Sequence, residues 1–171
     1  MFLQDVISEK TIVPDVKSRV KDDILKEMVS VLAGNGVLTD GNAFYDAVIE
    51  RENLESTAIG DEIAIPHAKH DSVKKIFCCL GRIKDGAEFN ALDNKPVKVF
   101  FLVAAPSEMN REYIQIVAKA ARLLKSGIMK QEILKAASAK DVMKIIVDFD
   151  RILQQSVEVK TKEGRIIHKD I

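Results

Sequence analysis

The sequence predicts an α/β protein built as a three-layer α/β/α sandwich, with helices on both faces of a central sheet. Three observations predict it. Helical periodicity of apolar residues comes before residue 51, a continuous apolar run fills residues 96–106, and helical periodicity returns from residue 108 to residue 153. A strand that is apolar on both faces needs a covering layer on each side. At 171 residues and 47% apolar, the chain can form the core of one domain without crosslinks.

The first two elements are helices. Apolar residues recur at helical spacing over residues 16–32, which predicts an amphipathic helix. Gly34 and Gly36 follow as stop signals. Asp40 is a candidate N-cap for a second helix that runs to Arg51. A helix, a turn and a helix therefore lead into the polar stretch that follows.

Two strands come next. Residues 72–83 and 96–106 are rich in Val, Ile, Phe and Leu, and the second run is expected to be the central strand of the sheet. The polar connection over residues 84–95 contains Gly86 and Asn94, so we expect a loop there, with a hairpin of edge strands as the alternative. Cys78 and Cys79 are adjacent, so their side chains point to opposite faces of a strand and are expected to be reduced core thiols.

The second half of the chain reads as helices. One is expected over residues 108–125, ended by Gly127, and two more over about 130–137 and 139–153, the last with Ser138 as its cap and Asp141 in its first turn. Residues 154–171 are polar and lysine-rich, and we expect a loose tail with, at most, a short strand at "SVEVK". The expected organisation is one domain over residues 1–153 and a tail over 154–171.

Composition excludes several classes of function. Lysine and arginine total 26 against 26 acids, so no overall charge draws the protein to nucleic acid or anionic lipid. No apolar stretch approaches the roughly 20 residues of a membrane helix, and Asp5 interrupts the N-terminus where a signal peptide is apolar, so we expect a cytoplasmic protein without membrane insertion. The sequence has no G-x-G-x-x-G motif, no Walker A loop and no G-x-S-x-G elbow, so it lacks the phosphate-binding loop of a nucleotide-dependent enzyme and the nucleophile of a serine hydrolase.

The three histidines are the candidate reactive groups. His67 follows Pro66, which ends the apolar run Ile63-Ala64-Ile65 and leaves the imidazole at the mouth of the predicted strand. A surface or capping histidine is the alternative reading. His70 forms an H-x-x-H pair with it, but no carboxylate or thiolate nearby completes a zinc site, so we expect no metal. His168 lies in the tail and is expected to be solvated.

The stretch "RENLESTAIGDEIAIPHAKH", residues 51–70, carries a family resemblance. It closely resembles the phosphohistidine signature of phosphotransferase-system IIA domains of the fructose/mannitol type, which include the nitrogen-regulatory relatives. That signature runs R-E, then T-x-x-G, then I-A-x-P-H. The resemblance extends to "FFLVAAP" and "VAKAARLL", and so covers most of residues 1–153. It implies a single α/β sandwich with a mixed sheet that relays a phosphoryl group and uses no cofactor.

The resemblance also implies roles and partners. His67 would accept a phosphoryl group from the phosphocarrier HPr or a paralogue and pass it to a IIB domain or use it as a regulatory signal. Arg51, beside Glu52, matches the family arginine, whose planar fork suits phosphoryl oxygens; a helix-end arginine paired with Glu52 or another acid is the alternative. Ser56 and Thr57 are candidates to hydrogen-bond the phosphoryl group or the imidazole, or only to stabilise the loop.

Tyr113 is a departure from the family pattern. The family usually has a second histidine at the start of the helix after the central strand, and here that place reads Glu112-Tyr113-Ile114. A phenol stays neutral in the physiological range and donates a hydrogen bond, but it brings no positive charge. We expect slower transfer or an altered stability of the phosphorylated form; a tyrosine that only packs at the helix start is the alternative.

Two classes of function remain open. One is a phosphoryl carrier in sugar uptake or in regulation, and the other is a regulatory binding module that has lost efficient phosphoryl transfer because Tyr113 replaces the second histidine. In either case we expect an apolar docking surface around His67, with contributions from Ile59, Ile63 or Ala68, and a small, transient partner interface.

Overall fold

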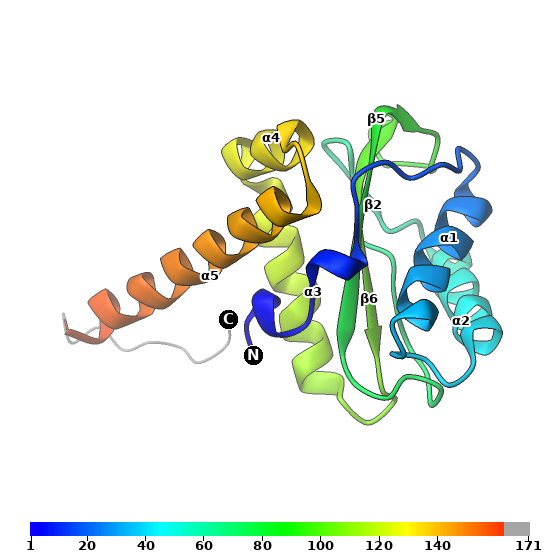
Figure 1. The fold of residues 1–171 in the computed structure, drawn as a ribbon, viewed down its shortest axis with the longest axis horizontal. Coiled ribbons are helices and arrows are strands. Elements are labelled where there is room, and N and C mark those ends of the chain that lie inside the picture. The colour runs from blue at the N-terminus through cyan, green and yellow to red at the C-terminus, as the bar shows by residue number, and fades with distance from the viewer. Residues whose placement is uncertain (163–171) are drawn as a thin grey trace.

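A mixed, six-stranded sheet forms the centre of the molecule (Figure 1). The computed structural model describes the backbone of residues 1–162 and the side chains of residues 1–156. Five strands follow one another in the order β1-β5-β6-β3-β2, and β4 pairs with β6 beside β3. Their bounds are β1 Ile12–Val13, β2 Ala58–Gly60, β3 Ile63–Ala64, β4 His67–Lys69, β5 Phe77–Ala87 and β6 Val97–Ala105.

Helices cover both faces of this sheet, as the sequence predicts. Helices α1 and α2 lie on one side, and α3, α4 and α5 lie on the other (Figure 1). The helices are α1 Lys21–Gly34, α2 Gly41–Leu54, α3 Asn110–Lys125, α4 Gly127–Lys135 and α5 Ala139–Lys162, and two short 3₁₀ helices, Leu3–Asp5 and Glu9–Thr11, precede β1.

Strand β6 explains why the sheet has two cores. All but one of its residues are buried, and successive side chains enter opposite clusters: Phe100 and Leu102 pack under α1 and α2, whereas Phe101 and Val103 pack under α3 and α5. Cys78 and Cys79 on β5 divide between the same two cores, and both are free thiols. The predictions of a central strand and of two reduced, oppositely directed cysteines are confirmed.

Helix ends follow local capping chemistry. The Asp40 side chain accepts from the backbone N–H of Ala43 at 2.9 Å, and the Ser138 hydroxyl accepts from the backbone N–H of Asp141 at 3.2 Å, so both predicted caps are confirmed. The prediction for Gly127 is wrong in detail. The Ser126 hydroxyl accepts from the backbone N–H of Met129, and Gly127 is the first residue of α4 rather than the stop of α3.

Two further expectations are corrected. The connection over residues 84–95 is not all loop, because β5 continues to Ala87 with a register shift between Arg82 and Ala87. This segment includes Gly86, whose φ of +78° a glycine adopts without strain. The tail is not loose from residue 154, and "SVEVK" is not a strand. Helix α5 runs through it to Lys162 because no glycine or proline interrupts residues 139–162. The division at residue 153 stays a prediction, and residues 163–171, with His168, lie outside the described part.

Candidate functional site

The strand that presents His67 is interrupted rather than ended. Strand β3 pairs in parallel with β6, with Ala64 opposite Phe100, and β4 resumes the same register with His67 opposite Val103. Pro66 lies in the gap, and its carbonyl still accepts from the backbone N–H of Val103 at 2.9 Å. Strand β3 does end before Pro66, as expected, but His67 does not lie beyond the sheet, since it is the first residue of a second short strand.

This interruption fixes the imidazole. Nδ1 of His67 lies 2.6 Å from the carbonyl oxygen of Ile65. A carbonyl oxygen only accepts, so Nδ1 must carry the proton and Nε2 keeps its lone pair. The side chain is half-buried, and Nε2 is the ring nitrogen that an incoming group would meet as a nucleophile.

Burial keeps this ring neutral. Desolvation lowers the pKa of His67 below its ordinary value of 6.5, against the hydrogen bond to Ile65, which raises it. The positive charge of Arg51 lowers the pKa further, and the charge of Glu52 opposes that effect. At neutral pH the imidazole is therefore uncharged and nucleophilic.

A pocket of about 250 Å³ brings Arg51 and His67 together. Arg51 lies in the last turn of α2, and its Nη1 donates to the carbonyl of Glu55 at 3.0 Å. Among the described residues it makes no ion pair with a carboxylate. Apolar side chains, Ile59, Leu92 and Val117 among them, form other parts of the wall. The guanidinium is thus held by a backbone carbonyl at one nitrogen and remains able to bind an anion in the pocket.

Glu52 belongs to the scaffold beneath the pocket. Its carboxylate is 4% exposed and accepts from the backbone N–H of Thr57 at 2.9 Å and from the Thr57 hydroxyl at 2.5 Å. It also pairs with the ammonium of Lys21 at 2.9 Å. The alternative pairing of Arg51 with Glu52 does not occur, because Lys21 of α1 is the partner of that acid.

The hydroxyls of Ser56 and Thr57 are engaged within the protein. Ser56 donates to the carbonyl of Phe89 at 3.0 Å, and its oxygen accepts from the backbone N–H of Ala58 at 3.3 Å. Thr57 is 4% exposed and donates to Glu52. Both residues line the pocket, and in the described geometry their hydroxyl protons are used to hold the loop between α2 and β2.

Tyr113 stands beside the imidazole. Its ring centroid lies 5.7 Å from that of His67, with the two planes tilted by 57°. It comes from the first turn of α3 and is half-buried, and burial raises its pKa to about 12. The phenol is therefore neutral at physiological pH, as the sequence predicts.

The apolar rim differs from the expected one. Ile59 lines the pocket, but Ile63 and Ala68 are 0% and 4% exposed, so neither offers surface to a partner. Leu92 is 70% exposed at the pocket, and Ile114, next to Tyr113, is 64% exposed. Sequence reasoning missed Leu92 because an isolated leucine in a polar connection carries no pattern of its own. It missed Ile114 because the helical periodicity counts this residue with the apolar face of the helix over residues 108–125.

The other histidine in the described part has a local role. Nδ1 of His70 lies 2.8 Å from the Ser72 hydroxyl and 3.1 Å from the backbone N–H of Ser72. Over residues 1–156, no group of three or more His, Cys, Asp or Glu side chains is placed to hold a metal ion. None of the helices in the described part is both long and apolar enough to cross a membrane.

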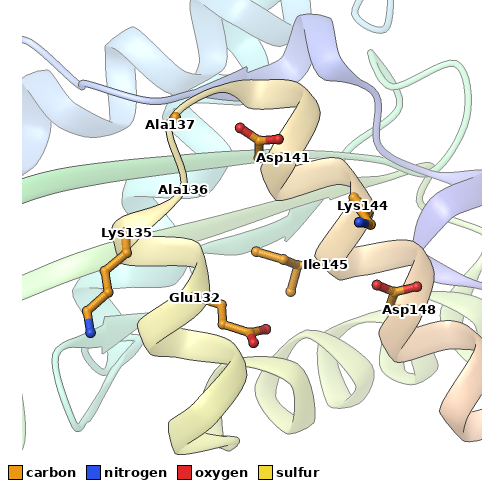
Figure 2. A pocket seen from close by; sticks show the side chains of 8 residues that line it. All are labelled: Glu132, Lys135, Ala136, Ala137, Asp141, Lys144, Ile145 and Asp148. Carbon is orange, nitrogen blue, oxygen red and sulfur yellow. The ribbon is translucent and has the colours of Figure 1, made fainter.

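A larger hollow, of about 430 Å³, lies between α4 and α5 (Figure 2), and His67 is not among the residues that line it. Ile145 points from α5 into the space between the two helices (Figure 2). The charged side chains around it are Glu132, Lys135, Asp141, Lys144 and Asp148. These carboxylates and ammonium groups are of mixed sign, and among the side chains that the structure describes no histidine, cysteine or serine lines the hollow. The smaller pocket at His67 is therefore the candidate site.

Comparison with known proteins gives sequence relatives of two kinds. The chain is 33% identical to the fructose-specific EIIABC component of Bacillus subtilis over 88% of its own length, and spans 24% of that protein. It is 28% identical to a nitrogen regulatory protein of Bradyrhizobium diazoefficiens, over 85% of this chain and 95% of that protein. The chain thus spans about a quarter of the first relative and nearly all of the second.

Solved structures share the fold. The nitrogen regulatory protein IIA-Ntr of Neisseria meningitidis superimposes with a TM-score of 0.78 at 24% identity, covering 84% of this chain and 97% of that one. Enzyme IIA mannitol of Escherichia coli, solved in complex with phosphorylated enzyme IIB mannitol, superimposes with a TM-score of 0.73 at 18% identity, covering 84% and 99%.

The family model for the phosphoenolpyruvate-dependent sugar phosphotransferase system, EIIA 2, matches residues 5–148. That range contains both cores of the sandwich except for Leu3 and Phe149, and it contains every residue of the His67 pocket. This chain therefore belongs to the EIIA 2 family of the sugar phosphotransferase system.

Proposed function

We propose that this protein is a phosphoryl carrier that accepts a phosphoryl group on Nε2 of His67. The observation that carries the proposal is the hydrogen bond between Nδ1 and the carbonyl of Ile65, in a pocket shared with Arg51. This hydrogen bond leaves Nε2 as the one nucleophilic nitrogen of a neutral ring, next to the Arg51 guanidinium, whose hydrogen bond to Glu55 uses a single nitrogen. Membership of the EIIA 2 family supports the same assignment.

The transfer step balances without an added acid or base. The lone pair of Nε2 on His67 forms the new N–P bond while the N–P bond of a donor phosphohistidine breaks, and its electron pair returns to the donor nitrogen. Each ring keeps the one proton it had, so the donor leaves as a neutral imidazole and His67 becomes a phosphorylated imidazolium. Tyr113 is therefore not required to move a proton, and the step is compatible with a phenol at that position.

Arg51 is proposed to stabilise the transferred group. Phosphoryl transfer depends chiefly on positioning and on stabilising charge on the equatorial oxygens, and a guanidinium can bind two of them at once. The apolar wall that includes Leu92 and Val117 lowers the local dielectric once a partner covers the pocket, which strengthens that interaction. Ser56, Thr57 and Glu52 are proposed to keep the loop between α2 and β2 in place.

The partners follow from the chemistry and from the relatives. We infer an HPr-type phosphocarrier as donor and, as acceptor, a IIB domain or a regulatory target reached in the cytoplasm. The complex of E. coli enzyme IIA mannitol with phosphorylated enzyme IIB mannitol supports a IIB partner. The nitrogen regulatory relatives support a regulatory target. The exposed Leu92 and Ile114 are proposed as apolar contacts for either partner.

Intact-mass measurement tests the proposal. The protein is incubated with phosphoenolpyruvate, Enzyme I and HPr, and we expect one added phosphoryl group in the wild type and in His70→Ala, and none in His67→Ala. His70 is the matched control because it lies three residues away and is partly buried like His67. An unmodified wild type, or a group that persists in His67→Ala, contradicts the proposal.

The second candidate is a binding module that works without phosphorylation, and the observation that favours it is the neutral Tyr113 beside His67. The same mass measurement separates the two, because the binding module predicts no phosphoryl group. Adding candidate IIB domains to the phosphorylated protein then distinguishes transport from regulation. Loss of the group to a IIB domain supports transport, and its retention with altered binding of a target supports regulation.

A further inference from the structure

Lys69 lies close to the proposed phosphorylation site. It follows His67 by two residues on β4, so both side chains project from the same face of that strand. Its ammonium contacts the side-chain oxygen of Asn110, the first residue of α3, and lies 5.8 Å from the ring centroid of Tyr113. The Tyr113 ring in turn lies 5.7 Å from that of His67. One aromatic ring therefore borders both the imidazole and the ammonium group.

The resting partners of this ammonium group hold it only weakly. Among the described residues, Lys69 makes no ion pair with a carboxylate. Its hydrogen bond within the described part of the chain is to a neutral amide, and it sits at the N-terminal end of α3, where the helix dipole disfavours a cation and favours an anion. The side chain is exposed and has a flexible four-carbon stem, so its ammonium group can turn toward a new negative charge nearby without a movement of the backbone.

Phosphorylation of His67 creates such a charge. A phosphoryl group on nitrogen carries up to two negative charges, and the imidazolium beneath it carries one positive charge. Arg51 is the cation on the α2 side of the pocket, and Tyr113 on the α3 side is neutral. Without another cation on the α3 side, the phosphoryl oxygens there would have only a phenol and the dipole of α3 to face.

We propose that Lys69 supplies this second positive charge, leaving Asn110 to pair with the phosphoryl group on His67 and stabilising the phosphorylated form. The inference rests on the proposed function, because it concerns the same phosphohistidine. In this arrangement Tyr113 donates a hydrogen bond and Lys69 contributes charge. The two side chains together provide what one protonated imidazole at position 113 would provide alone.

The equilibrium constant for phosphoryl exchange with HPr is the test, with Lys69→Gln compared with the wild type. Loss of a charge-assisted contact to an exposed group is expected to shift this constant by about tenfold toward phosphorylated HPr. The constant is read by intact mass at fixed ratios of the two proteins. It separates two roles of Lys69, because a residue that only helps docking slows the forward and reverse rates equally and leaves the equilibrium unchanged.

Lys75→Gln is the matched control. Lys75 is exposed and lies 5.1 Å from the ring centroid of Phe77, so it too is a lysine over an aromatic ring, but that ring is not the Tyr113 ring that borders His67. We expect its equilibrium constant to stay within about twofold of the wild type. Adding Tyr113→His to Lys69→Gln is expected to recover most of the shift, since an imidazole can carry the missing charge.

The proposal fails if Lys69→Gln leaves the equilibrium constant at the wild-type value or if Lys75→Gln shifts it equally. It also fails if the shift in Lys69→Gln is no smaller when Tyr113→His is present. Failure of the proposed function looks different, because then the wild-type protein acquires no phosphoryl group at all. Circular dichroism of each variant shows that it is folded before the exchange is measured.

Discussion

The buried carboxylate of Glu52 should be among the most sensitive positions of the fold, although it is proposed to have no direct part in phosphoryl transfer. Its two oxygens serve the backbone N–H of Thr57, the Thr57 hydroxyl and the ammonium of Lys21, with distances of 2.9, 2.5 and 2.9 Å. The Lys21 side chain is 19% exposed and lies 4.7 Å from the ring centroid of Phe89. These contacts tie α1, α2 and the loop before β2 into one unit.

Replacing Glu52 by Ala removes every one of these contacts. It leaves a largely buried ammonium group without its counter-charge and two buried donors of Thr57 without an acceptor. Breaking a buried ion pair from one side destabilises proteins by about 3–5 kcal/mol. Glu52→Gln keeps one acceptor oxygen and loses the charge, so we expect a smaller loss, of about 1–3 kcal/mol.

Urea denaturation followed by circular dichroism measures these losses. With a slope of about 2 kcal/mol per molar urea, Glu52→Ala should lower the midpoint by about 1.5–2.5 M. Glu50→Ala is the matched control, because Glu50 lies on the same helix, is exposed and makes none of these contacts, and its midpoint should change little. A loss below about 1 kcal/mol in Glu52→Ala would refute the reasoning, since the network would then contribute no more than a surface ion pair.

Three other outcomes follow from the geometry. Arg51→Gln should slow single-turnover phosphorylation of His67 by about 10²–10³-fold, because enzymes that lose a hydrogen-bond donor to a developing anion lose about that much in rate. A change below threefold would remove Arg51 from the proposed mechanism. Because burial lowers the pKa of His67, an NMR titration of its imidazole should have a midpoint below 6.5. The contribution of the neutral ring to the free energy of unfolding is then present above pH 6.5 and lost as the pH falls toward the folded-state pKa. A midpoint above 6.5 contradicts this account. Asp150→Ala should lower the free energy of unfolding by about 1–3 kcal/mol. The reason is that the buried Asp150 carboxylate accepts from two backbone N–H groups of the N-terminal 3₁₀ helix, at 3.2 and 2.8 Å. An unchanged urea midpoint would contradict this prediction.

The layers of the fold could be predicted because each depends on a local pattern. The apolar run over residues 97–105 has no polar face, so it had to be a central strand, and the amphipathic runs before and after it had to cover its two sides. The interruption at Pro66 could not be read in the same way. That β3 and β4 share one register on β6 depends on their partner strand, and the pattern of residues 63–69 alone does not say which strand that is.

The residues of the site also fall into two groups, those that a local sequence pattern predicts and those that depend on contacts between distant elements. His67 and Arg51 were predicted because one motif contains both, and Tyr113 because the family resemblance expects a second histidine at its position. The structure brings His67 within one pocket of Arg51 and 5.7 Å of Tyr113. Lys21 was missed, because its pairing with Glu52 joins two helices that are 31 positions apart at these residues. Lys69 was missed because an exposed lysine on a short strand resembles any other surface lysine until its neighbours are known.

The direct test of the central claim is the identity of the phosphorylated atom. Nitrogen-15 NMR of the histidine side chains, recorded after incubation with phosphoenolpyruvate, Enzyme I and HPr, distinguishes a phosphoryl group on Nε2 from one on Nδ1. We predict a single phosphorylated imidazole, that of His67, substituted at Nε2 and still protonated at Nδ1. Phosphorylation at Nδ1, or on His70, would contradict the role given to the hydrogen bond between His67 and Ile65.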